Sequence, residues 1–167
     1  QMFSNAINKF LDSGYRFIGL DHMAKENDVL SVATREKTID RNALSHSSGK
    51  AADILAIGPN SMSSFGKSYF QNFHSLPKYY SYIDSGQLPL VRGFTANDDD
   101  MLRRDIIFTL ICHSSIDFRK VEKDHNIKSF KDYFAFELSN ELKIMQNDDL
   151  VKINSDGIIV TNLGRLF

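Results

Sequence analysis

Short apolar runs and helical periodicity alternate through the first half of the chain. Residues 17–20 and 54–58 are apolar runs of the kind that form strands buried on both faces, and the first run belongs to a predicted strand over residues 15–20. Between them, residues 28–37 predict a helix that is capped by Asn27 or Asp28. A strand, a helix and a second strand in this order predict a βαβ unit, whose two strands are parallel.

Other helices are predicted from the spacing of apolar residues. One ends before Gly14, where a glycine suits the end of a helix, and a tyrosine-rich segment predicts another over residues 76–83. Residues 87–96 contain proline and glycine and predict a linker. Asn97 and the three aspartates after it predict the start of a further helix, because a side-chain cap and acidic residues stabilise a helix N-terminus.

The last third of the chain predicts helices followed by a hairpin. Residues 118–125 predict a short helix, and residues 129–145 predict a longer one with apolar positions three and four apart. Residues 151–153 and 158–160 predict two strands joined by an Asp-Gly turn. Three helices and then a hairpin are the order of a winged helix. The expected organisation is therefore a first domain over 1–86, a linker over 87–96 and a winged-helix-like domain over 97–167.

Composition and charge exclude several classes of protein. The 167 residues carry a net charge of −1, and residues 129–149 hold two lysines against five acidic residues, a balance that argues against DNA binding. No apolar run approaches the roughly 20 residues of a membrane-spanning helix. The single cysteine, Cys112, excludes an internal disulfide and any multi-cysteine metal site in this chain, and it is expected to be a buried, inert thiol. We expect a cytoplasmic protein that binds neither nucleic acid nor membrane.

Ionisable and turn residues follow both apolar runs. Asp21 and His22 come directly after the first run, and Gly58 and the turn that ends at Met62 close the second. Ligands gather at the carboxyl ends of parallel strands, so these residues are predicted to share one rim. Asp21 and His22 are candidates for an acid/base or ligand-orienting pair, with a helix cap and a polar core residue as the alternatives. Gly58 permits close approach of a ligand to the backbone, or it simply forms a turn.

Cations and rings elsewhere have two interpretations each. Arg41, Lys67 and Arg92 are candidates for binding carboxylates, and solvated surface charge is the alternative. The tyrosines and phenylalanines over residues 69–82 suit stacking on a flat ligand or packing within the protein.

Several stretches together resemble one enzyme family. They lie in the family's order across nearly the whole chain: GYRFIGLDHMA (14–24), DVLSVATREK (28–37), RN (41–42), DILAIG (53–58), SYFQN (68–72), DDMLRRDIIFTLIC (99–112), DYFAFEL (132–138) and VTNLGRL (160–166). They are similar to the C-terminal portion of oxygen-independent coproporphyrinogen III oxidase, a radical S-adenosylmethionine enzyme of haem biosynthesis. The chain is interpreted as the C-terminal part of such a protein.

The resemblance implies a fold and cofactors. It implies that the first domain is the last βα units of a partial (β/α) barrel, followed by the family's helical, winged-helix-like domain. It also implies S-adenosylmethionine and a [4Fe-4S] cluster in the full-length protein, with the cluster on a CxxxCxxC motif upstream of this chain. Neither cofactor nor any other metal is expected on the chain alone, which is therefore expected to be inactive.

The implied reaction is the oxidative decarboxylation of coproporphyrinogen III to protoporphyrinogen IX. Cofactors carry such chemistry, while the protein positions and shields the reacting groups. The implied partners are a tetrapyrrole substrate and the upstream part of the same protein, and self-association of this chain is left open.

The resemblance also implies which residues of this chain line the site, and at two of these positions the chain differs from the family. The family's Arg-Asn-Phe-Gln-Gly-Tyr-Thr-Thr stretch approaches cofactor and substrate; Arg41 and Asn42 match its first two positions, but Ala43 and Leu44 replace its phenylalanine and glutamine. Met62 matches an apolar contact to S-adenosylmethionine that is usually isoleucine. Three hypotheses result: an active oxidase, a non-catalytic haem- or porphyrin-binding paralogue, and an interaction module built on residues 95–167.

Overall fold

The chain folds into two compact units, which are described separately. The computed structural model describes residues 2–42, 45–49 and 53–166. The first unit comprises residues 1–50 and 104–167, and the second comprises residues 51–103. Their boundaries differ from the predicted ones, because the second unit takes the end of the predicted barrel segment together with the predicted linker.

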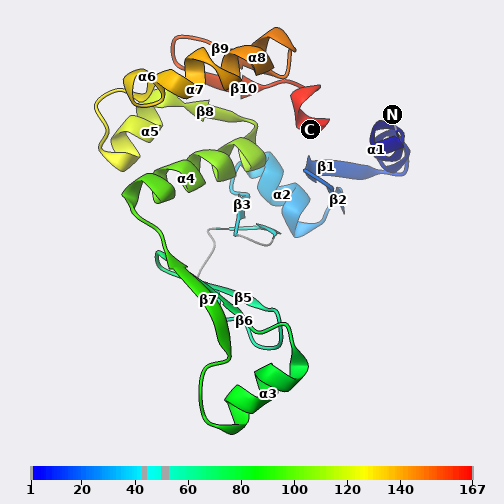
Figure 1. Ribbon diagram of the computed structural model, residues 1–167. Coiled ribbons are helices and arrows are strands. Elements are labelled where there is room, and N and C mark those ends of the chain that lie inside the picture. The colour runs from blue at the N-terminus through cyan, green and yellow to red at the C-terminus, as the bar shows by residue number, and fades with distance from the viewer. Residues whose placement is uncertain (1, 43–44, 50–52, 167) are drawn as a thin grey trace. The chain divides into compact units, whose positions relative to one another are not determined.

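The first unit begins with a helix and a hairpin. Helix α1 (Met2–Asp12) ends before Gly14, whose φ of +75° turns the chain into strand β1 (Tyr15–Gly19). Strand β2 (His22–Lys25) returns directly alongside β1, and the two strands pair antiparallel (Figure 1). Helix α2 (Val29–Glu36) follows, capped by the Asp28 carboxylate, which accepts a hydrogen bond from the Leu30 amide at 2.8 Å. The predicted helices over 28–37 and before Gly14 are confirmed.

The predicted parallel βαβ unit is wrong. Strand β1 pairs with β2, because Leu20, with a φ of +52°, turns the chain back immediately. Residues 54–58 form no strand: Ile54 makes a single antiparallel bridge to Ser64. Leu55 and Ile57 are 75% and 88% exposed, so this apolar run is not buried on both faces.

A small core joins the segments of the first unit around β1. Strands β3 (Asp40–Arg41) and β4 (His46–Ser47) form a second short antiparallel pair. Ile18 of β1 packs in one apolar cluster with residues from β2, from α2 and its C-terminal end, and from helix α4 (Asp98–His113): Ala24, Leu30, Ala33, Ile39 and Cys112. The Asn97 side chain caps α4 by accepting from the Asp100 amide at 2.9 Å, as the sequence predicts. Cys112 is buried, as predicted.

A three-stranded sheet and short helices complete the first unit. Strands β8 (Ser115–Asp117), β10 (Gly157–Val160) and β9 (Val151–Ile153) pair antiparallel in that order (Figure 1). Helix α5 (Phe118–His125) confirms the predicted helix, and a 3₁₀ turn, η1 (Gly164–Leu166), follows β10. The β9–β10 hairpin is also confirmed, with the Asn154 side chain accepting from the backbone amides of its turn.

The single helix predicted over residues 129–145 is wrong. Three shorter helices stand there: α6 (Phe130–Tyr133), α7 (Ala135–Ser139) and α8 (Glu141–Asn147). The backbone departs from helical angles at Asn140, with ψ of −91°, and the Ser139 and Asn140 side chains bond back to the Phe136 carbonyl. Such local bonds compete with a continuous helix. At the start of α6, the ring of Phe130 stacks on that of Phe118 at a centroid distance of 4.3 Å.

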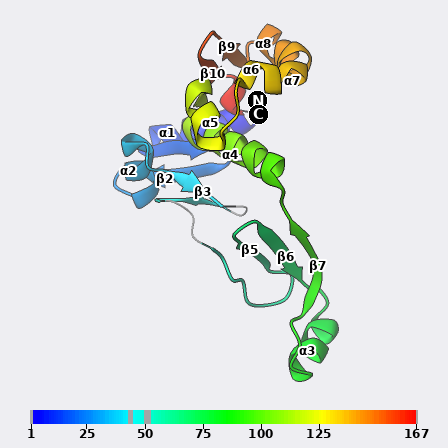
Figure 2. The same ribbon diagram turned by 90° about the vertical axis from the view of Figure 1, so that its left-hand side faces the viewer.

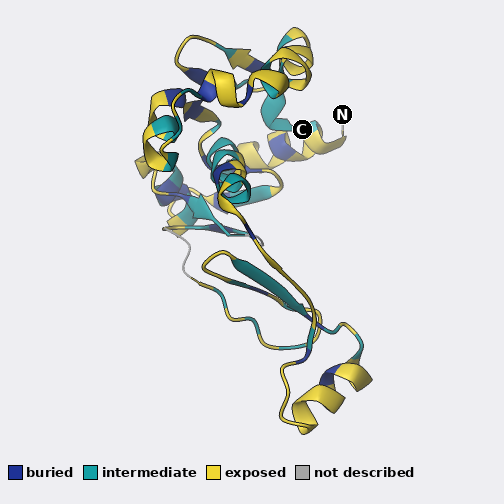
Figure 3. Cartoon of the chain, turned by 60° about the vertical axis from the view of Figure 1, so that its left-hand side comes forward, coloured by how far each residue is buried: buried dark blue, intermediate teal, exposed yellow. Residues whose placement is uncertain are grey.

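The second unit is an antiparallel sheet with one helix. Strands β5 (Met62–Phe65), β6 (Ser68–Asn72) and β7 (Leu90–Thr95) lie side by side in sequence order (Figure 2). Helix α3 (Leu76–Asp84) confirms the predicted tyrosine-rich helix, and it is exposed along most of its length (Figure 3). Most of the predicted linker is strand β7, which was missed because the partner that orders it, β6, is about 20 residues away in the sequence.

Neither the partial barrel nor the winged helix is tested directly by this architecture, and both stay predictions. Every strand pair within the described residues is antiparallel. Among those residues, no helix combines the length and the apolar character needed to cross a bilayer.

Candidate functional site

Asp21 and His22 lie at the tight turn between β1 and β2, not at the carboxyl edge of a parallel pair. The Asp21 Oδ1 atom is 2.9 Å from His22 Nδ1, but the two groups are poorly aligned for a hydrogen bond. The Asp21 side chain is 82% exposed, whereas that of His22 is about one-third exposed. Asp21 does not cap a helix, since Asp28 caps α2. The solvent-exposed Asp21 carboxylate is therefore placed to bias the orientation of the His22 ring.

His46, which the sequence analysis did not select, lies against His22. The two imidazole rings meet edge to face, with their centroids 4.9 Å apart. His46 is only 7% exposed, and neither of its ring nitrogens has a hydrogen-bond partner in the described part of the chain. A Cβ built on Gly19 would lie 3.3 Å from His46 Nε2, so the missing side chain at Gly19 makes room for the ring.

Burial and neighbouring groups favour the neutral form of the His46 imidazole. Burial lowers the pKa of His46, and the neighbouring His22 and Arg41 lower it further, against a smaller opposing effect of Asp21. A neutral imidazole offers one donor and one acceptor. His46 is therefore suited to hydrogen-bond a polar group of a ligand, and it does not serve as a fixed positive charge.

Arg41 and Asn42 are brought to the same place by the β3–β4 pair. Arg41 is directly opposite His46 in the register, and its guanidinium lies 5.2 Å from the centre of the Phe108 ring. Asn42 holds the turn, because its side chain accepts from the Ser45 amide at 2.9 Å and its own amide donates to the Ser45 carbonyl at 3.0 Å. The structure thus gathers Asp21, His22, Arg41 and Asn42 around His46, whereas Ala43 and Leu44 lie outside the described residues.

No sequence signal marked His46 as part of this group. It stands in a polar loop and lacks the spacing of a metal-ligand set, so only the tertiary contact with β1 and β2 reveals its burial. It occupies the position of the tyrosine in the related family's stretch. The His22–His46 contact therefore depends on a residue in which this chain departs from that stretch.

Gly58, in the second unit, is a structural turn. Its amide donates to the Tyr79 hydroxyl at 3.2 Å, and its carbonyl accepts from Ser61 Oγ at 2.7 Å and Asn72 Nδ2 at 3.0 Å. Its φ is +110°, which side chains rarely adopt. Both backbone polar groups of Gly58 are already used by the protein, and this favours the turn interpretation over close contact with a ligand.

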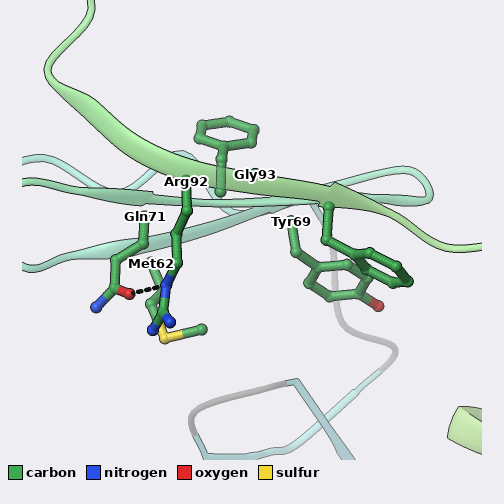
Figure 4. Close-up of a pocket in the computed structure, with 7 residues that line it drawn as sticks. Met62, Tyr69, Gln71, Arg92 and Gly93 are labelled. Atoms are coloured by element: carbon green, nitrogen blue, oxygen red, sulfur yellow. Dashed lines mark hydrogen bonds between the residues drawn. The ribbon is translucent and has the colours of Figure 1, made fainter.

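Met62 lines a pocket on one face of the second unit's sheet. The pocket has a volume of about 290 Å³, and the seven residues that line it are Met62, Tyr69, Phe70, Gln71, Arg92, Gly93 and Phe94. Met62, Gln71 and Arg92 are opposite one another on β5, β6 and β7, so their side chains emerge on the same face. Figure 4 shows these side chains and that of Tyr69 on one side of the sheet. Arg92 and the ring of Tyr69 thus belong to a pocket, while Lys67 pairs with Asp98.

The chain does not supply ligands for an iron–sulfur cluster. The described residues contain no group of three histidine, cysteine or acidic side chains placed to hold a metal ion. Cys112 is the single cysteine, and burial raises the pKa of its thiol to about 11, against the thiolate form that a cluster needs. The residues present therefore do not fit a [4Fe-4S] cluster.

The chain is similar over nearly its whole length to oxygen-independent coproporphyrinogen III oxidases. It is 40% identical to oxygen-independent coproporphyrinogen III oxidase of Salmonella typhimurium over 154 residues, which are 92% of this chain and 33% of that protein. It is 34% identical to the Pseudomonas aeruginosa enzyme of the same name over 166 residues, which are 99% of this chain and 36% of that protein. No family model matches the chain.

A solved structure has the same fold. It is coproporphyrinogen III oxidase (HemN) from Escherichia coli, described as a radical SAM enzyme, and it superimposes with a TM-score of 0.90 at 37% identity over 98% of this chain and 37% of that one. The class to which the matched structure belongs is the radical SAM enzymes. This chain matches the C-terminal portion of oxygen-independent coproporphyrinogen III oxidase, which confirms the resemblance seen in the sequence. The chain spans about a third of the length of these relatives.

Proposed function

We propose that this chain is the substrate-side portion of a longer oxygen-independent coproporphyrinogen III oxidase. That protein would convert coproporphyrinogen III to protoporphyrinogen IX by oxidative decarboxylation. The observation that carries the proposal is the match of 92–99% of the chain to enzymes of this name, together with the superposition on HemN.

The upstream portion of that protein would hold the cluster, because this chain lacks the ligands for it. That upstream portion would also cover the exposed apolar side chains of Leu55 and Ile57. This chain's own residues would bind the substrate and exclude water from it.

The group around His46 would contact polar arms of the substrate. A neutral, buried imidazole without a partner in the described residues and the Arg41 guanidinium are complementary to carboxylates, of which coproporphyrinogen III has four. Met62, as the match to a family contact with S-adenosylmethionine, would lie at the cofactor side of the second unit's pocket.

A second candidate function follows from Ala43 and Leu44. These two residues stand where the family's site has a phenylalanine ring and a glutamine amide. The loss of that ring and that amide favours a protein that binds a tetrapyrrole without converting it. The two functions share the binding residues and differ in turnover.

A chimera separates the two functions. This chain replaces the matching third of the Escherichia coli oxidase, and the purified, anaerobically reconstituted chimera is assayed with coproporphyrinogen III. Conversion by the chimera supports the oxidase. Conversion only after the double change Ala43→Phe and Leu44→Gln supports the non-catalytic paralogue. If both chimeras take up a full cluster and neither converts the substrate, the oxidase is refuted; if in addition neither binds a porphyrin, the non-catalytic paralogue is refuted as well. The chain alone serves as the negative control.

A further inference from the structure

Arg92 is held in place through one edge of its guanidinium. Its Nε donates to Gln71 Oε1 at 2.8 Å (Figure 4), and Gln71 Nε2 in turn donates to Asn60 Oδ1 at 2.8 Å. Since the Gln71 oxygen accepts from a guanidinium, its amide nitrogen must face Asn60, where it finds an acceptor. The hydrogen bonds thus run in one direction, from Arg92 on β7 through Gln71 on β6 to Asn60 in the turn before β5.

The other edge of the guanidinium faces the pocket without a partner. Neither terminal nitrogen of Arg92 has a hydrogen bond or ion pair among the described residues, and none of the residues that line the pocket is acidic. Two parallel N–H groups on one edge match the two oxygens of a carboxylate. Because Gln71 already fixes the side chain, little further rotational freedom is lost when a carboxylate binds.

The rest of the pocket is apolar and partly aromatic. Tyr69 is opposite Phe94 in the register and lies two residues from Gln71, so both rings share the face of Arg92. Met62 supplies a flexible thioether on the same face. A volume of about 290 Å³ is at the lower end for small-molecule sites, which suits one flat ring with a short acidic arm better than a whole macrocycle.

We propose that Arg92 binds a carboxylate carried on a short arm by a flat, apolar ring, and that the arm is a propionate of the tetrapyrrole substrate. This assignment rests on the proposed function. Gln71 is the positioning residue, because it acts on the ligand only through the orientation of Arg92. S-adenosylmethionine also carries a carboxylate, and the experiment separates the two sources.

The test is a titration of this chain with coproporphyrin III, the air-stable oxidised tetracarboxylate, followed by its absorbance. Arg92→Leu should weaken binding roughly 10- to 100-fold, as expected for the loss of a charge-assisted pair. Arg92→Lys should weaken it less, because a point charge remains without the paired donors. Gln71→Leu should weaken it several-fold. The control Arg119→Leu removes an exposed arginine of α5 and should leave affinity unchanged.

Two further ligands sharpen the result. The tetramethyl ester of the same porphyrin has no carboxylate, so it should bind wild type and Arg92→Leu equally. Absence of porphyrin binding to wild type, or equal affinity of wild type and Arg92→Leu for coproporphyrin III, overturns the proposal. Dependence on Arg92 for S-adenosylmethionine alone overturns the tetrapyrrole assignment. An inactive chimera with Arg92-dependent porphyrin binding refutes the oxidase and leaves this site standing.

Discussion

One methyl group added at Gly157 should strongly disturb the first unit. Gly157 begins β10 and pairs with Asp117 of β8. A Cβ built on Gly157 would lie 2.1 Å from the Ile116 carbonyl oxygen, a separation that real side chains do not show. The atom that it meets belongs to the backbone, so no side-chain rotation relieves the overlap. The β8–β10 pair must open.

The size of the effect follows from the bonds that the opening breaks. Moving β10 by roughly 1 Å lengthens the ladder next to Gly157 and the neighbouring bond from the Phe118 amide to the Asp156 carbonyl, now 2.9 Å. Loss of about two to three hydrogen bonds at about 1 kcal/mol each, with some strain, gives about 2–4 kcal/mol for Gly157→Ala. For a chain of this length that corresponds to a fall of roughly 5–15 °C in Tm.

Thermal circular dichroism measures the fall, and hydrogen exchange locates it. Peptides that cover residues 114–118 and 151–160 should lose protection in Gly157→Ala. Gly49→Ala is the matched control, because a Cβ at Gly49 would meet no atom within 4 Å. If Gly157→Ala has the same Tm as Gly49→Ala and these peptides keep their protection from exchange, the close approach of β8 and β10 is refuted.

Two titratable groups in the first unit give further predictions. Burial lowers the pKa of His46, so the unfolded chain takes up the proton at higher pH than the folded chain does. Stability should therefore fall as the pH drops through about 6.5. His46→Phe should make that decline shallower, as measured by Tm at constant ionic strength. An unchanged pH profile in His46→Phe would mean that His46 is not the group responsible. Cys112 is 7% exposed, and burial raises the pKa of its thiol to about 11. A disulfide reagent at mildly alkaline pH should therefore label the native chain only at the rate of unfolding. In denaturant the same reagent should label Cys112 at once. Rapid stoichiometric labelling of the native chain would show that the thiol is accessible.

The family resemblance and the ends of many elements were available from the sequence, because they depend on local chemistry. Asp28 and Asn97 cap their helices with their own side chains, and Asn154 organises the hairpin turn within four residues. Such bonds need no partner that is distant in the chain, so the amino-acid sequence alone is enough to predict them. The resemblance likewise depends on the identity and order of residues, and the comparisons confirmed it although the predicted strand pairing was wrong.

Pairing and burial were decided only in three dimensions. The apolar run at residues 15–20 indicates that a strand forms, but not which strand lies beside it, and the turn at Leu20 gives β1 an antiparallel neighbour. His46 is buried because Gly19, 27 positions earlier, leaves room for its ring. Arg92 becomes part of a pocket because β7 pairs with β6 and places it beside Gln71. The burial of His46 and the placement of Arg92 depend on contacts between residues far apart in the chain, which periodicity and composition do not encode. The β1–β2 pair depends instead on the backbone conformation of the turn at Leu20, which an apolar run does not reveal.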